Sequence, residues 1–209
     1  MNFLKVKDKL QAVDILPGSK AHNELSPPYR KSYTPVQIEA ENPRSASVLI
    51  VVYEKSERLY FPLILRTVYE GVHSGQIGLP GGKREKDDLT QADAALRETF
   101  EELGLIKEKM EIVKKMTPLY IPPSNFYVHP YIAIYHEKKI EFLPDKKEVQ
   151  QVYEIDISQF LYHTSIVMKS KYNNTVPAFI YNNLEIWGAT AMILNEFRVL
   201  LKSDIFTGF

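Results

Sequence analysis

The alternation of apolar and polar positions separates an N-terminal segment, residues 1–44, from a longer segment, residues 45–209. Apolar side chains recur at helical spacing through the first 20 residues and stop at Pro17 and Gly18, which predicts an amphipathic helix. Four prolines between residues 21 and 44 then predict an extended arm without regular structure. Such an arm either wraps its own domain or reaches a second copy of the chain, which makes a homodimer possible.

The longer segment begins with two apolar runs. Residues 45–54 and 59–67 are almost continuously apolar, which predicts two buried strands joined by the charged hairpin at 55–58. Glycines recur in residues 70–88, and this stretch is expected to be a loop.

A helix is predicted for residues 89–105. Thr90 is placed to cap its first turn, and Asp93 three residues later completes a capping-box spacing. Gly104 is the expected stop, because glycine accepts the left-handed conformation in which many helices end. The less polar side chains fall on one face: Ala92, Ala95, Leu96, Thr99 and Leu103.

The remaining pattern adds strands and two further helices. The expected elements are strands at 110–120 and 128–137, a strand leading into a short helix at 148–161, a strand or hairpin at 177–188, and a helix at 189–202. Strands and helices mixed without a repeating βαβ unit favour an α/β fold with a mixed β-sheet.

Composition excludes several classes of function. Lysine plus arginine and aspartate plus glutamate both number 26, and this balance argues against a nucleic-acid binder, which needs a basic surface. The absence of cysteine excludes disulfides, thiol catalysis and cysteine-ligated zinc. Early charges and the lack of a long apolar run argue against a signal peptide or a membrane span, so a cytoplasmic protein is expected.

The predicted helix carries a cluster of carboxylates. Glu98 and Glu102 stand one above the other at i and i+4, and Glu101 lies beside them at i+3. Like charges at this spacing repel, and a hard divalent cation such as Mg²⁺ or Mn²⁺ would convert the repulsion into binding. Such clusters are more often solvated helix faces, but here the Gly81–Gly82 turn lies just upstream, where backbone groups can approach a metal or phosphate.

This combination resembles the Nudix box, a glycine followed by an arginine-glutamate pair, a glutamate pair and a second glycine. Gly82 and the run RETFEELGL at residues 97–105 carry the resemblance. The spacing from Gly82 to Arg97 is one residue longer than the pattern, and Thr99 replaces an apolar residue. The metal-bearing half of the pattern is otherwise intact.

The longer spacing is similar to that of the coenzyme A pyrophosphatase branch of the Nudix family. The stretch GGK at residues 81–83 and ALRE at residues 95–98 match its box. An upstream signature of that branch is matched by Arg66, Gly75 and the PGG stretch at residues 80–82, whereas Gly71 stands where the signature has a second arginine. The resemblance covers about residues 46–201.

The resemblance implies a Nudix hydrolase domain over residues 45–209, folded as a Nudix-type α/β/α sandwich with a mixed β-sheet. It implies Mg²⁺- or Mn²⁺-dependent hydrolysis of coenzyme A or its acyl derivatives to 4′-phosphopantetheine and adenosine 3′,5′-bisphosphate. An alternative is a Nudix pyrophosphatase for ADP-ribose, NADH or a nucleoside triphosphate. A second alternative is a module that senses nucleotides without cleaving them, but such modules usually lose box glutamates, and this chain keeps Glu98, Glu101 and Glu102.

Roles follow from the resemblance. The metal ligands would be Glu98, Glu101 and Glu102, helped by a carbonyl of the glycine turn at Gly82, and Arg97 would orient the glutamates through a bidentate ion pair. Glu148 is the candidate general base, and Glu85 and Asp88 are further candidates to contact metal or water. The small nucleotide-type substrate would be held by Arg66, Lys83, Gly81, Gly82 and Gln76, with His73 as a further candidate. Tyr120, Asn125 and Phe126 would line the nucleobase or pantetheine side, and Trp187 and Tyr153 are expected in the core.

Overall fold

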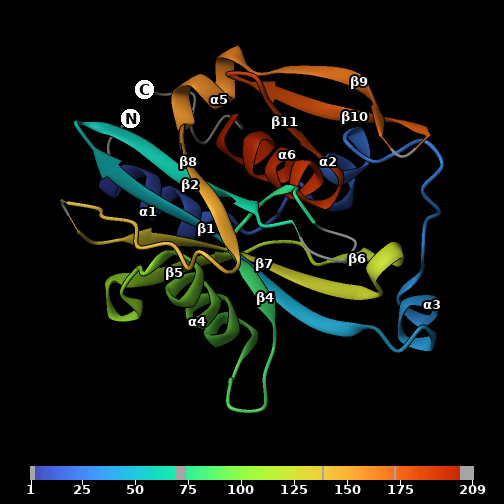
Figure 1. Ribbon diagram of the computed structural model, residues 1–209, viewed down its shortest axis with the longest axis horizontal. Coiled ribbons are helices and arrows are strands. Elements are labelled where there is room, and N and C mark those ends of the chain that lie inside the picture. The colour runs from blue at the N-terminus through green and yellow to red at the C-terminus, as the bar shows by residue number, and fades with distance from the viewer. Residues whose placement is uncertain (1–2, 69–73, 138, 172, 203–209) are drawn as a thin grey trace.

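A mixed sheet of eight strands forms the centre of the computed structural model, which describes residues 3–68, 74–137, 139–171 and 173–202 (Figure 1). Its strands run in the order β3-β2-β1-β7-β5, with β4 paired to β1, β6 to β7 and β8 to β2. Among the described pairings only β1 and β7 are parallel, so the predicted mixed sheet is confirmed. The strands are β1 (Arg44–Lys55), β2 (Arg58–Arg66), β3 (Ile77–Gly78), β4 (Gly81–Lys83), β5 (Met110–Lys115), β6 (Leu119–Ile121), β7 (Phe126–Tyr135) and β8 (Val149–Asp156).

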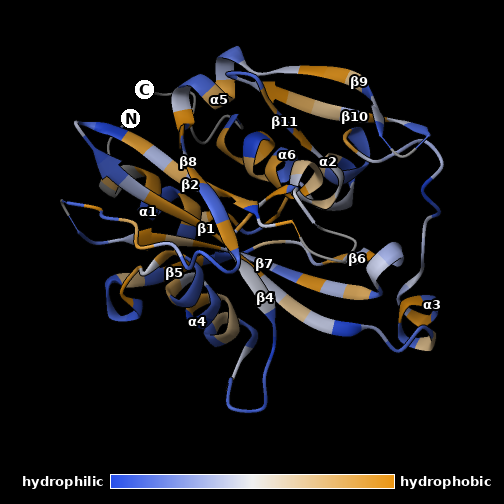
Figure 2. Ribbon diagram, in the orientation of Figure 1, coloured by the Kyte–Doolittle hydropathy of each residue, from blue (hydrophilic) through white to orange (hydrophobic). Residues whose placement is uncertain are grey.

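The sheet is buried on both faces by helices. Side chains of β1 alternate, so that Leu49 and Val51 pack under α4 (Gln91–Leu103), whereas Ile50 and Val52 face α1 (Phe3–Ala12) and α6 (Gly188–Lys202). In Figure 1, α4 lies below the sheet and α6 above it. Figure 2 shows the loop between β4 and α4 as hydrophilic, while α6 carries a band of apolar residues.

The start and stop predicted for the carboxylate-bearing helix are confirmed. Thr90 accepts a hydrogen bond from the backbone N–H of Asp93, whose side chain accepts one from the N–H of Thr90, and this completes the capping box. Gly104 ends the helix at φ 72°, and its N–H donates to the carbonyl of Phe100 over 2.7 Å. Local hydrogen bonds therefore fix both ends of α4.

The N-terminal segment contains more regular structure than expected. Helix α1 is present but ends at Ala12, before the predicted stop at Pro17. The arm predicted to lack regular structure contains most of α2 (Gly18–Glu24) and all of α3 (Pro35–Ala40). Thr34 caps α3 and proline occupies its first position, a local start signal that outweighs the proline content of the arm. Helix α2 packs against α6. Val6 and Leu10 of α1, and Val13 just after it, join the same core cluster as the sheet.

A second, three-stranded antiparallel sheet lies over α6 (Figure 1). It consists of β9 (Ser165–Lys171), β10 (Asn174–Tyr181) and β11 (Leu184–Trp187), and helix α5 (Ile157–His163) precedes it. The hairpin of β10 and β11 was predicted, whereas β9 was missed because its apolar residues Ile166 and Met168 are exposed and form no buried run. No helix in the described part of the chain is long and apolar enough to cross a membrane.

Candidate active site

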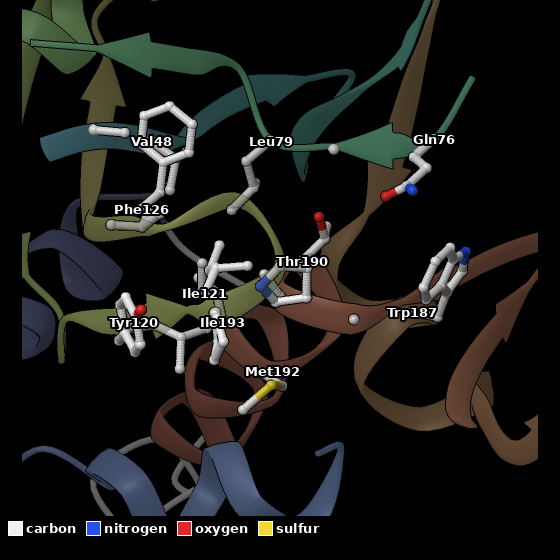
Figure 3. Close-up of a pocket in the computed structure, with 18 of the residues that line it drawn as sticks. Val48, Gln76, Leu79, Tyr120, Ile121, Phe126, Trp187, Thr190, Met192 and Ile193 are labelled. Carbon is white, nitrogen blue, oxygen red and sulfur yellow. The ribbon is translucent and has the colours of Figure 1, made fainter. Parts of the chain in front are cut away.

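A cavity of about 710 Å³ opens between the sheet, α6 and the N-terminal arm, within the size range of small-molecule sites. One end is formed by Arg66, Gly81, Gly82 and Lys83. Glu102, Glu98 and Arg97 contact these residues from outside the cavity lining. The name box end is used here for the four lining residues together with the charged group behind them: Asp88, Arg97, Glu98, Glu101, Glu102 and Glu148. The other end of the cavity, called the arm end, is formed by Pro27, Tyr29, Arg30, Lys31 and Tyr33. Between them, β6, β7 and α6 supply mostly apolar walls, with Tyr120 and Phe126 opposite Gln76 and Trp187 in Figure 3.

The glycine pair at the box end has backbone at Gly81 and a flexible carboxylate at Gly82 where a side chain would lie. Gly81 has a φ of 140°, and a Cβ there would lie 2.2 Å from the carbonyl oxygen of Ser47 on β1. A Cβ on Gly82 would lie 2.3 to 2.5 Å from the carboxyl atoms of Glu98. The stretch expected to be a loop therefore contains strands β3 and β4, because the absence of side chains at Gly81 and Gly82 lets this backbone pair with β1. It also lets Glu98 of α4 pack directly on Gly82.

Glu102 is the most buried of the three box glutamates, with its side chain 1% exposed. It accepts hydrogen bonds from the N–H of Gly81 over 2.7 Å and from Nη1 of Arg66 over 2.9 Å. Burial raises the pKa of Glu102 to about 7, against the opposing influence of Arg66 and the Gly81 N–H. Arg66, expected to hold phosphate, therefore ties Glu102 to the glycine turn, because its Nη2 also donates to the Gly81 carbonyl over 2.9 Å.

Glu98 lies between the glycine turn and two other carboxylates. Its side chain is 14% exposed, and burial raises its pKa, while Arg97 lowers it and Glu101 and Glu148 raise it further. Glu148, just before β8, also raises the pKa of Glu102. The fold thus brings Glu148 from a distant loop into electrostatic contact with Glu98 and Glu102, whereas Glu101 is 53% exposed and turns toward Arg97.

Arg97 connects the helix to the loop that precedes it. Its Nε and Nη2 form a bidentate pair with Asp88 at 3.0 and 2.9 Å, and its Nη1 donates to Glu98 over 3.2 Å and to Glu101 over 2.9 Å. The bidentate partner is therefore Asp88 and not a box glutamate. Asp88 also accepts the N–H of Glu85 over 2.8 Å, so its carboxylate secures the loop, and Glu85 itself is exposed.

The donor chemistry of the box end fits a hard divalent cation. Within the described residues, no three histidine, aspartate or glutamate side chains surround a single point as they would in a closed metal cage. Mg²⁺ and Mn²⁺ sites need less, because such ions are commonly held by one or two carboxylates together with water and substrate phosphates. Glu98, packed on Gly82, and the neighbouring Glu102 and Glu148 supply oxygen donors of this kind.

Other predicted residues are divided between the cavity and its surroundings. Lys83, Gln76, Tyr120 and Phe126 line the cavity, whereas Asn125 hydrogen bonds to the carbonyl of Glu41 and to the Tyr120 hydroxyl. Tyr153 packs, partly buried, against the core. His73 and Gly71 lie outside the described residues.

Two parts of the cavity wall were not anticipated. Trp187, expected in the core, is only half-buried and lines the cavity, because the turn into α6 places it at the open edge of the second sheet (Figure 3). The arm end was also missed, since nothing in the spacing of Arg30 or Tyr33 indicates a binding wall. The sequence signal that could have indicated the position of Trp187 is that it directly precedes Gly188, where the last helix begins.

Comparison with known proteins identifies the family. The NUDIX domain family matches residues 43–171. The chain is 31% identical over 157 residues to "Uncharacterized Nudix hydrolase NudL" of Yersinia pestis (strain Pestoides F), which covers 73% of this chain and 77% of the relative, and the same values hold for the protein of that name in Yersinia pseudotuberculosis serotype O:1b (strain IP 31758).

A solved structure supports the fold. The MutT/nudix family protein from Enterococcus faecalis superimposes with a TM-score of 0.50 at 15% identity, covering 99% of this chain and 78% of that one. The predicted fold class is thereby confirmed. Together with the carboxylates of α4 and the glycine turn, the match over residues 43–171 shows that the chain belongs to the Nudix hydrolase family.

Proposed function

We propose that this Nudix hydrolase cleaves the diphosphate bond of coenzyme A or its acyl derivatives, giving 4′-phosphopantetheine and adenosine 3′,5′-bisphosphate. The observation that carries the proposal is the cavity, which begins at the glycine turn and continues along apolar and aromatic walls to the arm. Coenzyme A has the matching chemistry, since its diphosphate lies between a nucleoside and a long, weakly polar pantetheine arm.

The composition of the walls favours coenzyme A over a nucleoside triphosphate. Leu119, Ile121 and Met192 are apolar, and Tyr120, Phe126 and Trp187 offer aromatic faces for a base. A triphosphate would leave most of this apolar surface without a partner. ADP-ribose and NADH fit the aromatic faces but have no pantetheine arm, and the upstream signature that includes Arg66 and Gly75 supports the coenzyme A branch.

The roles of the side chains follow from their contacts. Glu98 and Glu102 would hold Mg²⁺ or Mn²⁺, with Glu101 and a carbonyl of the glycine turn at Gly82 as further donors. When bound, such an ion neutralises charge on the diphosphate and lowers the pKa of an attacking water. Glu148 would accept the proton of that water, because it is the exposed carboxylate whose charge reaches both Glu98 and Glu102.

The remaining residues position the metal ligands or contact the substrate. Arg97 holds Glu98 and Glu101 while it is anchored on Asp88, and Arg66 holds Glu102 against the glycine turn. Lys83 and Gln76 line the cavity beside that turn and would contact phosphate oxygens. Substrate would thus be bound by Gln76, just before β3, and by Lys83 on β4, and cleaved beside α4.

The test is a substrate panel read by mass spectrometry. The protein is incubated with Mg²⁺ or Mn²⁺ and coenzyme A, acetyl-CoA, ADP-ribose, NADH or nucleoside triphosphates. Cleavage of coenzyme A ahead of the others, with 4′-phosphopantetheine and adenosine 3′,5′-bisphosphate as products, supports the proposal. A preference for ADP-ribose or NADH would change the proposed substrate but not the proposed metal site. Ligand-induced stabilisation without any cleavage would favour a sensing module.

A further inference from the structure

Arg30 is a half-buried cation in the wall of the cavity, supplied by the N-terminal arm. A turn places it there, because its N–H donates to the carbonyl of Pro27 over 2.9 Å. Its guanidinium lies between β6 and α6, where Nη2 donates to the carbonyl of Tyr120 and Nη1 lies 3.1 Å from the sulfur of Met192. Both partners are uncharged.

The environment of Arg30 differs from that of the arginines at the box end. Arg66 and Arg97 are each paired with carboxylates, whereas no carboxylate of the described residues lies within ion-pair distance of Arg30. Burial lowers the pKa of Arg30 and Tyr33 opposes the shift, in keeping with a cation that has no carboxylate beside it. Buried charges are normally paired, so a guanidinium held this way at a cavity wall suits an anionic ligand.

The neighbours of Arg30 indicate what kind of ligand carries the anion. Lys31 also lines the cavity, which gives the arm end two adjacent positive groups suited to a dianion. Tyr33 lines it as well and packs edge-on against Tyr120, with ring centroids 5.1 Å apart. An aromatic pair beside two cations matches a nucleoside that carries its own phosphate group.

We propose that the arm end binds a phosphomonoester on the nucleoside half of the substrate, separate from the diphosphate that is cleaved. Arg30 and Lys31 bind this phosphate, and Tyr33 and Tyr120 contact the adjoining base. The inference rests on the proposed function for its substrate class, since coenzyme A carries such a group at the ribose 3′ position. A dinucleotide with a ribose 2′-phosphate has the same chemistry.

The test measures binding without catalysis. Dissociation constants for adenosine 3′,5′-bisphosphate and adenosine 5′-monophosphate are determined by calorimetry for the wild type, Arg30→Met, Arg30→Lys and Lys31→Gln. The wild type is expected to prefer the bisphosphate at least about tenfold, the scale of a charged hydrogen bond. Arg30→Met removes that preference, whereas Arg30→Lys and Lys31→Gln retain part of it. Lys20→Gln, an exposed position of α2 outside the cavity lining, is the matched control.

The two sources of the phosphate are separated by kinetics on paired substrates. If the 3′-phosphate is recognised, Arg30→Met raises KM for coenzyme A but not for 3′-dephospho-coenzyme A. If a 2′-phosphate is recognised, Arg30→Met raises KM for NADPH but not for NADH. Adenosine 2′,5′-bisphosphate is measured in the same way. Equal affinity of the wild type for the monophosphate and both bisphosphates, or an equal loss of affinity for all three in Arg30→Met, would overturn the inference. Failure to hydrolyse coenzyme A would refute the proposed function. The dissociation constants of the adenosine ligands would still test the phosphate site.

Discussion

The two ends of the cavity handle charge in opposite ways. At the box end, Arg66 and Arg97 bind Glu102, Glu98, Glu101 and Asp88, so positive and negative groups hold one another in place. At the arm end, Arg30 has only a backbone carbonyl and a thioether as partners among the described residues. The charges of the box end therefore balance one another, whereas our proposal assigns the charge of Arg30 to an anionic ligand.

We therefore expect residues of the box end to act on the chemical step, and residues of the arm end to act on which substrate binds. Groups fixed by mutual ion pairs are positioned before substrate arrives, which is what transition-state stabilisation requires. A cation without a carboxylate partner contributes when a matching anion binds, and therefore acts on affinity. Changes at the box end should lower kcat, and changes at the arm end should raise KM.

The largest effect is expected from Glu98→Gln. Removal of this carboxylate charge should lower kcat by roughly 100-fold or more, with little change in melting temperature, because Gln keeps the shape that packs on Gly82. Steady-state kinetics and thermal unfolding of the same preparation measure both. Glu108→Gln, on an exposed turn, is the control and should behave as wild type. Near-native turnover of Glu98→Gln would remove the proposed metal site.

The second largest effect is expected from Glu196→Gln, which weakens the attachment of α2 to α6. Glu196 of α6 is fully buried, and its carboxylate lies within hydrogen-bond distance of the Gly18 N–H at 3.1 Å, His22 Nε2 at 3.0 Å and the Thr117 hydroxyl at 2.6 Å. Glu196→Gln should reduce the free energy of unfolding by about 2 to 3 kcal/mol, since an amide would face donors. Denaturant titration measures the loss.

The same variant sharpens the comparison of the two ends. Because α2 forms the start of the arm, a loosened α2 should raise KM more than it lowers kcat at a temperature where the variant is folded. A fall in kcat with an unchanged KM would contradict the assignment of substrate affinity to the arm end.

A smaller effect is expected from Gly82→Ala. The added methyl group must displace the carboxylate of Glu98, which a flexible side chain can do without unfolding the protein. We expect kcat to fall roughly tenfold through misplacement of the ligand, with the fold retained. Gly81→Ala is the contrast, because its Cβ would meet the backbone of Ser47 and should destabilise the whole protein. Equal thermal stability of the two variants would contradict this geometry.

The smallest effect is the pH dependence of Asp88. Hydrogen bonds from Arg97 hold the pKa of the Asp88 carboxyl below its ordinary value, although burial opposes the shift. A depressed carboxyl pKa stabilises the fold above its unfolded value of about 4, and this contribution disappears as pH falls through the folded value. Asp88→Asn should therefore be about 1 kcal/mol less stable than wild type at pH 7, and the gap should narrow below pH 4. A gap independent of pH would contradict the pairing.

Much of the box end was predictable because its information is local. The helical spacing of residues 89–105, the Thr90 cap and the Gly104 stop depend on neighbours within a few positions, and each was confirmed. The helix α3 was missed although its start signal is local, because the prolines were given more weight than the Thr34 cap. The strand β9 could not be read locally, because its exposed apolar residues leave no pattern of burial.

The Nudix family and the spacing of Glu98, Glu101 and Glu102 along α4 could be read from the residue pattern alone. The pairing of the charges could not, and neither could the pairing of Gly81 and Gly82 with β1. Arg66 lies 36 residues before Glu102, and Arg30 lies 90 residues before the carbonyl of Tyr120, so neither contact follows from spacing. The physical reason is that periodicity and capping act within a few residues, whereas the partner of a buried cation depends on which distant segments the hydrophobic core brings together.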